Sequence, residues 1–169
     1  MRRFSFPALL LAVLLLAGCP FSSDIPLSDP AGASVDAALA GAWKMKDPET
    51  GEVRTFTFKV FNGHELVGLT PGDEKDSVDA FRVFTTEIGA ERFLNVQELG
   101  SDAGWYLVHY KVDAGKLVLT LVDDTLFDGK TFASSDVLAQ YVRQNLADPR
   151  LYAAAGDTRE DMVWEREAP

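Results

Sequence analysis

The sequence predicts a mainly β protein: an eight-stranded antiparallel up-and-down barrel with one C-terminal helix before the last strand. Runs rich in Val, Phe, Thr and Tyr alternate with turn signals from residue 41 to residue 124. The connections are short, which is typical of neighbouring antiparallel strands. A long meander leaves two exposed sheet edges unless the last strand pairs with the first. An open, strongly curved sheet that cradles the helix is the alternative arrangement.

The first strand is expected at residues 41–46, GAWKMK. The next two strands, EVRTFTFKVF and HELVGLT, flank Asn62-Gly63. This dipeptide is the one most typical of a two-residue hairpin turn. Such a turn places Phe58 opposite Val67.

Two further hairpins follow along the chain. DAFRVFTTEI and ERFLNVQEL flank a Gly-Ala turn that places Val83 opposite Val96. GWYLVHYKV and KLVLTLVDD flank Asp-Ala-Gly, and this turn places Tyr110 opposite Leu119. In each register one face of both strands is largely apolar, as expected of the face that lines the interior. The predicted inward residues are Phe56, Phe58, Val67, Leu69, Phe81, Val83, Leu94, Val96, Tyr106, Val108, Tyr110, Leu117, Leu119 and Leu121.

Large side chains dominate this inward set, so we expect a mostly filled interior with at most a shallow pocket at one mouth. Glu65 and Glu98 also face inward in these registers, near strand ends, where rim positions are expected. The opposite face carries apolar residues too, and those that the helix leaves exposed would form a surface for a partner. They are Leu66, Phe84, Phe93, Trp105, Leu107, Val118 and Val122.

The helix is predicted over residues 134–147, SSDVLAQYVRQNLA. Ser134 or Ser135 suits its N-cap, and Asp148-Pro149 ends it. The last strand is expected at residues 161–166, DMVWER. The predicted apolar stripe of the helix consists of Val137, Leu138, Tyr141, Val142 and Leu146.

The N-terminus has a short basic head followed by an apolar run of about a dozen residues. A bilayer-spanning helix needs roughly 20, so the run is typical of a secretory signal. LAGC, residues 16–19, holds the one cysteine of the chain and resembles the lipobox of bacterial lipoproteins. The resemblance implies cleavage before Cys19, diacylglycerol on its sulfur and fatty acyl chains such as palmitate. An ordinary secretory signal with an incidental cysteine is the alternative.

With cleavage before Cys19, the sequence is expected to divide into three segments. Residues 1–18 form a signal peptide that is removed, residues 19–34 a flexible tether rich in Pro, Ser and Asp, and residues 35–169 the barrel domain. The lipid bilayer of the bacterial cell envelope is the expected partner, through acylated Cys19. Pro20 in place of Asp after the cysteine resembles the signal for export to the outer membrane, where the domain faces the periplasm or the surface.

The charge of the chain excludes some classes of partner, and its cysteine content excludes disulfides from the predicted domain. Removal of residues 1–18 with their two arginines takes the formal charge from −10 to −12. This acidic balance argues against nucleic acid and against anionic head groups as partners. The predicted domain contains no cysteine, so its stability rests on packing rather than on disulfides.

Gly41-Ala42-Trp43 at the first strand matches the Gly-x-Trp signature of the lipocalin-like (calycin) group. Arg166, on the last strand, corresponds to the arginine that covers the tryptophan in that family. The resemblance extends over residues 36–166 and implies the barrel fold. The chain departs from the family pattern in having seven strands rather than eight before the helix.

No constellation of residues indicates catalysis, a metal or a cofactor. His64 flanks a hairpin turn, and His109 lies on the face opposite the predicted interior. Asp123, Asp124 and Asp128 resemble part of a calcium loop, but serine stands where the final glutamate should be. We therefore expect a non-enzymatic protein that needs no cofactor.

Binding is the expected function, because an eight-stranded barrel can hold one small ligand. Tyr106, Tyr110, Phe58 and Phe81 are the predicted ligand-binding residues, since a buried tyrosine hydroxyl needs a partner. A packed aromatic core is the simpler interpretation of the same residues. The alternative function is a protein-interaction or inhibitory module in the envelope, which acts through the outer face or through acidic loops.

Overall fold

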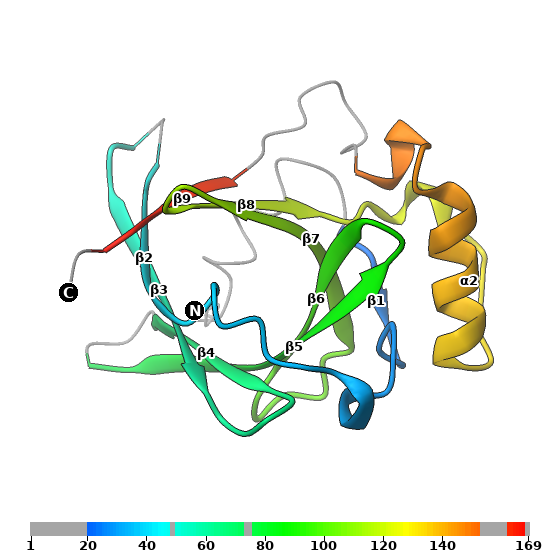
Figure 1. Ribbon diagram of the computed structural model, residues 1–169, viewed down its shortest axis with the longest axis horizontal. Helices are drawn as coiled ribbons and strands as arrows, with labels where there is room; N and C mark the ends of the chain where they lie inside the picture. The colour runs from blue at the N-terminus through cyan, green and yellow to red at the C-terminus, as the bar shows by residue number, and fades with distance from the viewer. Residues whose placement is uncertain (1–19, 48–49, 73–75, 153–161, 168–169) are drawn as a thin grey trace, which may run out of the picture.

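A computed structural model describes residues 20–47, 50–72, 76–152 and 162–167. Within these ranges the protein is mainly β, as predicted, and eight antiparallel strands close into a barrel (Figure 1). Strand β9 pairs with both β8 and β2, and this double pairing closes the barrel. The strands are β2 (Gly41–Lys46), β3 (Val53–Val60), β4 (Leu66–Pro71), β5 (Val78–Ile88), β6 (Glu91–Glu98), β7 (Trp105–Asp113), β8 (Lys116–Leu121) and β9 (Met162–Arg166).

The helix α2 (Ser135–Asn145) precedes β9 and stands outside the barrel (Figure 1). Its N-cap is Ser134, whose hydroxyl accepts a hydrogen bond from the backbone N–H of Val137. Leu138 and Val142 are fully buried, whereas Val137 is 47% exposed, so the buried face is narrower than the predicted stripe. Three short 3-10 helices complete the described elements: η1 (Pro30–Gly32), η2 (Asp124–Leu126) and η3 (Pro149–Leu151).

Two of the three predicted hairpin registers are confirmed. Val83 lies opposite Val96, and Tyr110 lies opposite Leu119. In the β7–β8 turn Ala114 and Gly115 have φ angles of 45° and 80°. Positive φ at both central positions is the geometry that matches the twist of the flanking strands.

The predicted register of the β3–β4 hairpin is wrong by one residue. Phe58 lies opposite Gly68 rather than opposite Val67. The side-chain oxygen of Asn62 accepts hydrogen bonds from the backbone N–H groups of the second and third residues after it, at 2.7 and 2.8 Å. This local turn widens the connection beyond two residues, because asparagine bonds its own backbone there.

The one-residue shift exchanges the two faces of β4. Leu66 belongs to the inner apolar cluster and is 1% exposed, although the sequence analysis places it outside. Val67 and Leu69, which the sequence places inside, take the outer face. Glu65 also lies outside, where its carboxylate accepts two hydrogen bonds from Arg82, at 2.7 and 2.9 Å. This ion pair lowers the pKa of Glu65.

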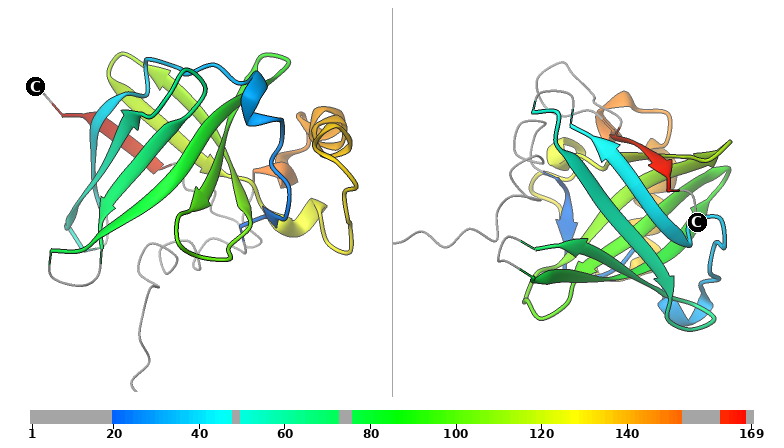
Figure 2. Two further views of the ribbon diagram at one scale, coloured as in Figure 1. Left: turned by 90° about the horizontal axis from the view of Figure 1, so that it is seen from below. Right: turned by 90° about the vertical axis from the view of Figure 1, so that its left-hand side faces the viewer.

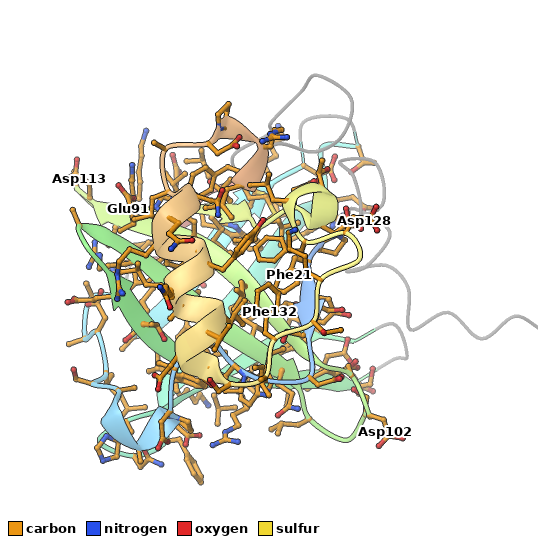
Figure 3. All side chains as sticks on the ribbon, turned by 90° about the vertical axis from the view of Figure 1, so that its right-hand side faces the viewer. Phe21, Glu91, Asp102, Asp113, Asp128 and Phe132 are labelled. Carbon is orange, nitrogen blue, oxygen red and sulfur yellow. The ribbon has the colours of Figure 1, made fainter. Side chains whose placement is uncertain are left out.

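Apolar side chains form two clusters, one inside the barrel and one between its wall and α2. In the outer cluster the rings of Phe21 and Phe132 lie beside α2 (Figure 3). It includes three of the seven apolar residues predicted for the outer face, namely Phe93, Leu107 and Val122. Phe84, Phe93, Trp105, Leu107 and Val122 are each at most 6% exposed.

The described part of the predicted tether, residues 20–34, packs on the barrel instead of hanging free. Phe21 is 6% exposed and Leu27 is fully buried. The backbone N–H of Leu27 donates a hydrogen bond of 2.6 Å to Oδ1 of Asn95, a buried residue of β6. The short strand β1 (Ser22–Ser23) pairs with β7. The sequence does not predict this packing, because the isolated apolar residues among Pro, Ser and Asp show neither helical nor strand periodicity.

Residues 33–40 cover one end of the barrel, which we call the closed end. Leu39 is fully buried in the inner cluster, and its carbonyl accepts a hydrogen bond of 2.8 Å from Nε1 of Trp43. The guanidinium of Arg166 lies 4.3 Å from the centre of the Trp43 ring and donates to the carbonyls of Ala38 and Ala40. Gly41 has a φ of 126°, a backbone conformation that favours glycine, and a Cβ there would also lie 2.9 Å from Nη1 of Arg166. These contacts and the closed barrel are consistent with a lipocalin-like fold.

Candidate functional site

A cavity of about 170 Å³ lies at the other end of the barrel, which we call the open end. At this end β3, β5, β7 and β9 begin and β2, β4, β6 and β8 finish. Figure 3 shows Asp102, in the β6–β7 connection, near this end, and Glu91 and Asp113 at the closed end. The inward residues nearest the strand ends line the cavity: Met45, Arg54, Asp79, Glu98, Tyr106 and Met162.

The size of the cavity limits what it can hold. Pockets for drug-sized ligands usually measure about 300–1,000 Å³. An apolar cavity of about 150 Å³ holds a single benzene ring. The cavity of 170 Å³ therefore has room for one ring or a short apolar chain, with the rest of a longer ligand outside the mouth.

The absence of a side chain on Gly68 leaves room for the Phe56 ring in the cavity wall. A Cβ at this position would lie 2.6 Å from Cζ and 2.8 Å from Cε1 of Phe56. The Phe56 ring therefore rests against bare backbone, which brings it close to Phe58 and Phe81, with ring centroids 4.8 and 5.9 Å away. Any side chain on Gly68 would push the ring, because these atoms cannot approach so closely.

Three of the four predicted ligand-binding residues lie together, and the fourth does not. Phe58, Phe81 and Tyr106 all line the cavity. Tyr110 lies at the closed end, although it shares the inward face of β7 with Tyr106. Four residues of strand separate the two tyrosines by about 13 Å, so they cannot line one shallow pocket.

Tyr110 has a structural partner at the closed end. Its hydroxyl donates a hydrogen bond of 3.0 Å to Oδ2 of Asp36, which also accepts one of 2.7 Å from Arg92. Arg92 lies over the Tyr110 ring, 4.9 Å from its centroid. Burial and then the Asp36 carboxylate raise the pKa of Tyr110 well above its ordinary value. The phenol therefore stays neutral and ties the covering segment to the wall.

Trp164 is the most informative cavity residue that the sequence analysis missed. It lines the cavity from β9 and is 5% exposed. Within the described ranges its indole Nε1 is buried and has no hydrogen-bond partner. An unsatisfied buried donor costs about 1–3 kcal/mol, so such groups are rare without a reason. The sequence did not predict that Trp164 faces inward, because no hairpin turn assigns a register to β9.

The rim of the cavity is charged. Arg54 donates a hydrogen bond of 3.1 Å to Oδ2 of Asp47, so its charge is neutralised within the protein. Asp79 and Glu98 also line the cavity, and in the part of the chain that the structure describes neither forms an ion pair. The mouth is therefore apolar inside and acidic at its edge. Glu98 takes the rim position that the sequence predicts for it.

Both histidines are held by neighbours away from the cavity. Nδ1 of His64 lies 2.6 Å from the carbonyl oxygen of Ala33, where the covering segment begins. His109 is 4% exposed beside the outer cluster, with its ring 5.4 Å from that of Phe93 and Nε2 2.5 Å from Oε2 of Glu91. Neither histidine lines the cavity at the open end. The His64 contact ties the covering segment to the barrel, and the His109 contact joins β7 to β6.

The aspartates after β8 build a turn. Asp123 is 4% exposed and caps η2, accepting a hydrogen bond from the backbone N–H of Thr125. Burial, followed by the charges of Asp123 and Asp128, raises the pKa of Asp124. Among the described residues, no three His, Cys, Asp or Glu side chains are grouped as metal ligands.

Comparison of the chain with protein-family models, with curated proteins and with solved structures found no significant match. No helix in the described part of the chain is long and apolar enough to cross a membrane.

Proposed function

We propose that this protein is a non-enzymatic lipoprotein of the bacterial cell envelope that binds a small apolar or amphipathic ligand at the open end of its barrel. The cavity is the observation that carries the ligand proposal. It is enclosed by apolar side chains from the inner cluster and edged by a few polar groups, which is the usual composition of a ligand site.

The polar groups define the chemistry of the ligand. The indole N–H of Trp164 lacks an acceptor, so a carbonyl, ether or hydroxyl oxygen in the ligand would satisfy it. Asp79 and Glu98 at the mouth repel an anionic head group. We therefore propose a neutral or cationic ligand with one apolar ring or short chain and one acceptor.

Native mass spectrometry tests whether the protein carries such a ligand. A chain from Pro20 to Pro169 suits the measurement, because it keeps both apolar clusters and needs no detergent that would compete for the cavity. We expect a co-purified molecule that dissociates on activation. A protein that is always ligand-free, and that binds none of the probes below, would contradict the proposal.

Probe titration followed by NMR locates the site. The chain has three tryptophans, and the indole N–H resonance of Trp164 is assigned by its loss in Trp164→Phe. We expect benzyl alcohol, whose hydroxyl oxygen can accept, and 4-methoxybenzylammonium, whose ether oxygen can accept, to shift this resonance. The indole of Trp43, bonded to the carbonyl of Leu39 at the closed end, is the internal control. Equal shifts of both resonances, or equal binding of benzoate, would refute the proposed site chemistry.

The lipid anchor rests on the sequence, because Cys19 lies outside the described residues. The lipobox resemblance of residues 16–19 supports acylation and attachment to the envelope, and Pro20 after the cysteine favours export to the outer membrane. We expect Cys19→Ser to abolish fatty-acid labelling and membrane fractionation. Continued labelling of this variant would refute the anchor.

The alternative function, a protein-interaction or inhibitory module, needs an exposed surface. Most of the apolar residues predicted for the outer face are buried beneath other segments. In the described part of the chain they therefore form no exposed apolar patch that would favour a protein partner. The acidic surface remains available to a basic partner.

A further inference from the structure

The chain reaches the barrel at the same end as the cavity. Pro20 forms an isolated antiparallel bridge with Asp123, just beyond the end of β8. Ser23 lies opposite Trp105, the first residue of β7. Both positions lie at the open end, where β8 finishes and β7 begins (Figure 2).

The first described residues are held firmly in this position. The backbone N–H of Phe21 donates a hydrogen bond of 2.8 Å to the carbonyl of Val122. The Phe21 ring stacks on Phe127 with a centroid distance of 3.7 Å. A few residues later Leu27 is fastened to Asn95. There is no free chain between Pro20 and the barrel wall.

This attachment leaves little distance between the barrel and an anchor at Cys19. Consecutive Cα atoms are about 3.8 Å apart, so the acylated residue would lie beside the open end. A free tether of 16 residues would instead reach roughly 20–24 Å and leave the orientation of the barrel undetermined. Given the proposed acylation of Cys19, on which this step rests, we infer that the open end of the barrel faces the lipid bilayer.

The orientation gives the cavity direct access to lipid. Its mouth would open toward head groups and acyl chains, so an apolar ligand could move between bilayer and barrel without crossing bulk water. At the rim Val53, Val78 and Leu99 are 63%, 61% and 50% exposed and would touch the interface. Such contacts alone do not decide the orientation, because Phe61 at the closed end is 70% exposed. The position of the anchor decides it.

Charge at the open end selects the kind of lipid surface. Asp79 and Glu98 line the mouth, and Asp102 lies near the same end (Figure 3). These carboxylates would be repelled by anionic lipids and tolerated by zwitterionic ones. The inferred contact surface is therefore a zwitterionic bilayer such as phosphatidylcholine.

Depth-dependent quenching tests the orientation with the mature, acylated chain in phosphatidylcholine vesicles. Acylation consumes the thiol of Cys19, so Leu99→Cys at the open end and Phe61→Cys at the closed end each introduce a single reactive thiol. Each is labelled with a nitrobenzoxadiazole fluorophore, and the vesicles contain nitroxide-labelled lipid. The eight residues of β3 span about 23 Å along the strand and, with a tilt of about 35–45°, about 16–19 Å along the barrel axis. We therefore expect quenching at Leu99→Cys to exceed that at Phe61→Cys roughly threefold or more.

A linker variant supplies the matched control. Insertion of about 12 Gly and Ser residues between Cys19 and Pro20 adds a reach of roughly 17–21 Å, so the difference between the two probes should largely disappear. Equal quenching of both probes without the linker, or stronger quenching at Phe61→Cys, would overturn the orientation. Mass spectrometry of the same samples keeps the two proposals apart, because a chain without diacylglycerol refutes the anchor itself.

Discussion

The substitution Asn95→Ala tests whether the segment before residue 34 belongs to the folded domain. Asn95 is fully buried in the barrel wall and accepts a hydrogen bond of 2.6 Å from the backbone N–H of Leu27. Its amide donates to Oγ1 of Thr86 at 2.8 Å and to the carbonyl of Phe84 at 3.4 Å. One side chain thus joins the N-terminal segment to two strands of the barrel.

The expected cost follows from these bonds. Alanine leaves the N–H of Leu27 buried without an acceptor, which costs about 1–3 kcal/mol. Thr86 keeps its 2.6 Å hydrogen bond with Ser28, so the further loss is that of one or two weaker bonds, about 1 kcal/mol. We expect the free energy of unfolding to fall by about 2–4 kcal/mol. For a domain of this size the melting temperature would fall by roughly 4–16 °C.

Hydrogen exchange and urea denaturation measure the two consequences. In Asn95→Ala we expect the amides of residues 21–28 to exchange much faster, because the segment can detach without unfolding the barrel. Gln97→Ala is the matched control, since Gln97 lies on the same face of β6 and makes one side-chain bond, of 3.3 Å, to Ala103. If the amides of residues 21–28 are unprotected in the wild-type protein, the segment is a free tether and the reasoning fails.

Three further substitutions test the open end, the turn after β8 and the closed end. Gly68→Ala should push the Phe56 ring, cost about 1–3 kcal/mol of stability and weaken probe binding in the NMR titration, whereas Gly63→Ala, with no atom within 4 Å of the new Cβ, should change neither. The raised pKa of Asp124 means that the folded state binds this proton more tightly than the unfolded state, so stability is lost as pH rises through the folded value. Asp124→Asn should therefore raise stability at pH 7 by about 0.2–0.5 kcal/mol, with the gain vanishing in urea titrations below pH 3.8, and a lower midpoint at pH 7 would contradict this sign. Arg166→Ala should lower the free energy of unfolding by about 1–2 kcal/mol, because it removes two hydrogen bonds to carbonyls and the contact with the Trp43 ring. Arg166→Lys should recover less than half of this loss, because an ammonium cannot bind both carbonyls and stack on the ring. Full recovery of thermal stability by lysine would argue against that geometry.

Local patterns in the sequence determined most of the barrel. Alternating apolar residues and short turns gave the strand order and two of the three registers, and a serine cap with an apolar stripe located α2. The Gly-x-Trp motif and Arg166 predicted that the guanidinium lies over the Trp43 ring. These signals lie within a few residues of the structure they specify, apart from Arg166, for which a family resemblance supplied the partner.

The candidate site was predicted only in part. Phe58, Phe81 and Tyr106 follow from alternation, because every second residue of a strand faces inward. Tyr110 obeys the same rule but lies at the other end, and alternation carries no information about position along the barrel axis. Arg54 and Asp79 lie at the starts of β3 and β5, and Glu98 lies at the end of β6. In an antiparallel meander these three positions share one end of the barrel. Trp164 needed the pairing of β9, which no turn specifies.

The sequence by itself determined which residues form strands, which form the helix and which residues are the proposed site of cleavage and acylation. Tertiary structure decided the face that β4 presents, the packing of residues 20–34 and the end at which the chain enters the barrel. The reason is the range of the interactions. Asn62 reset a register through its own turn, whereas Leu27 meets Asn95 across 68 positions of sequence. A contact of that range has no local period, so only the folded chain reveals that Pro20 and the cavity lie at the same end of the barrel.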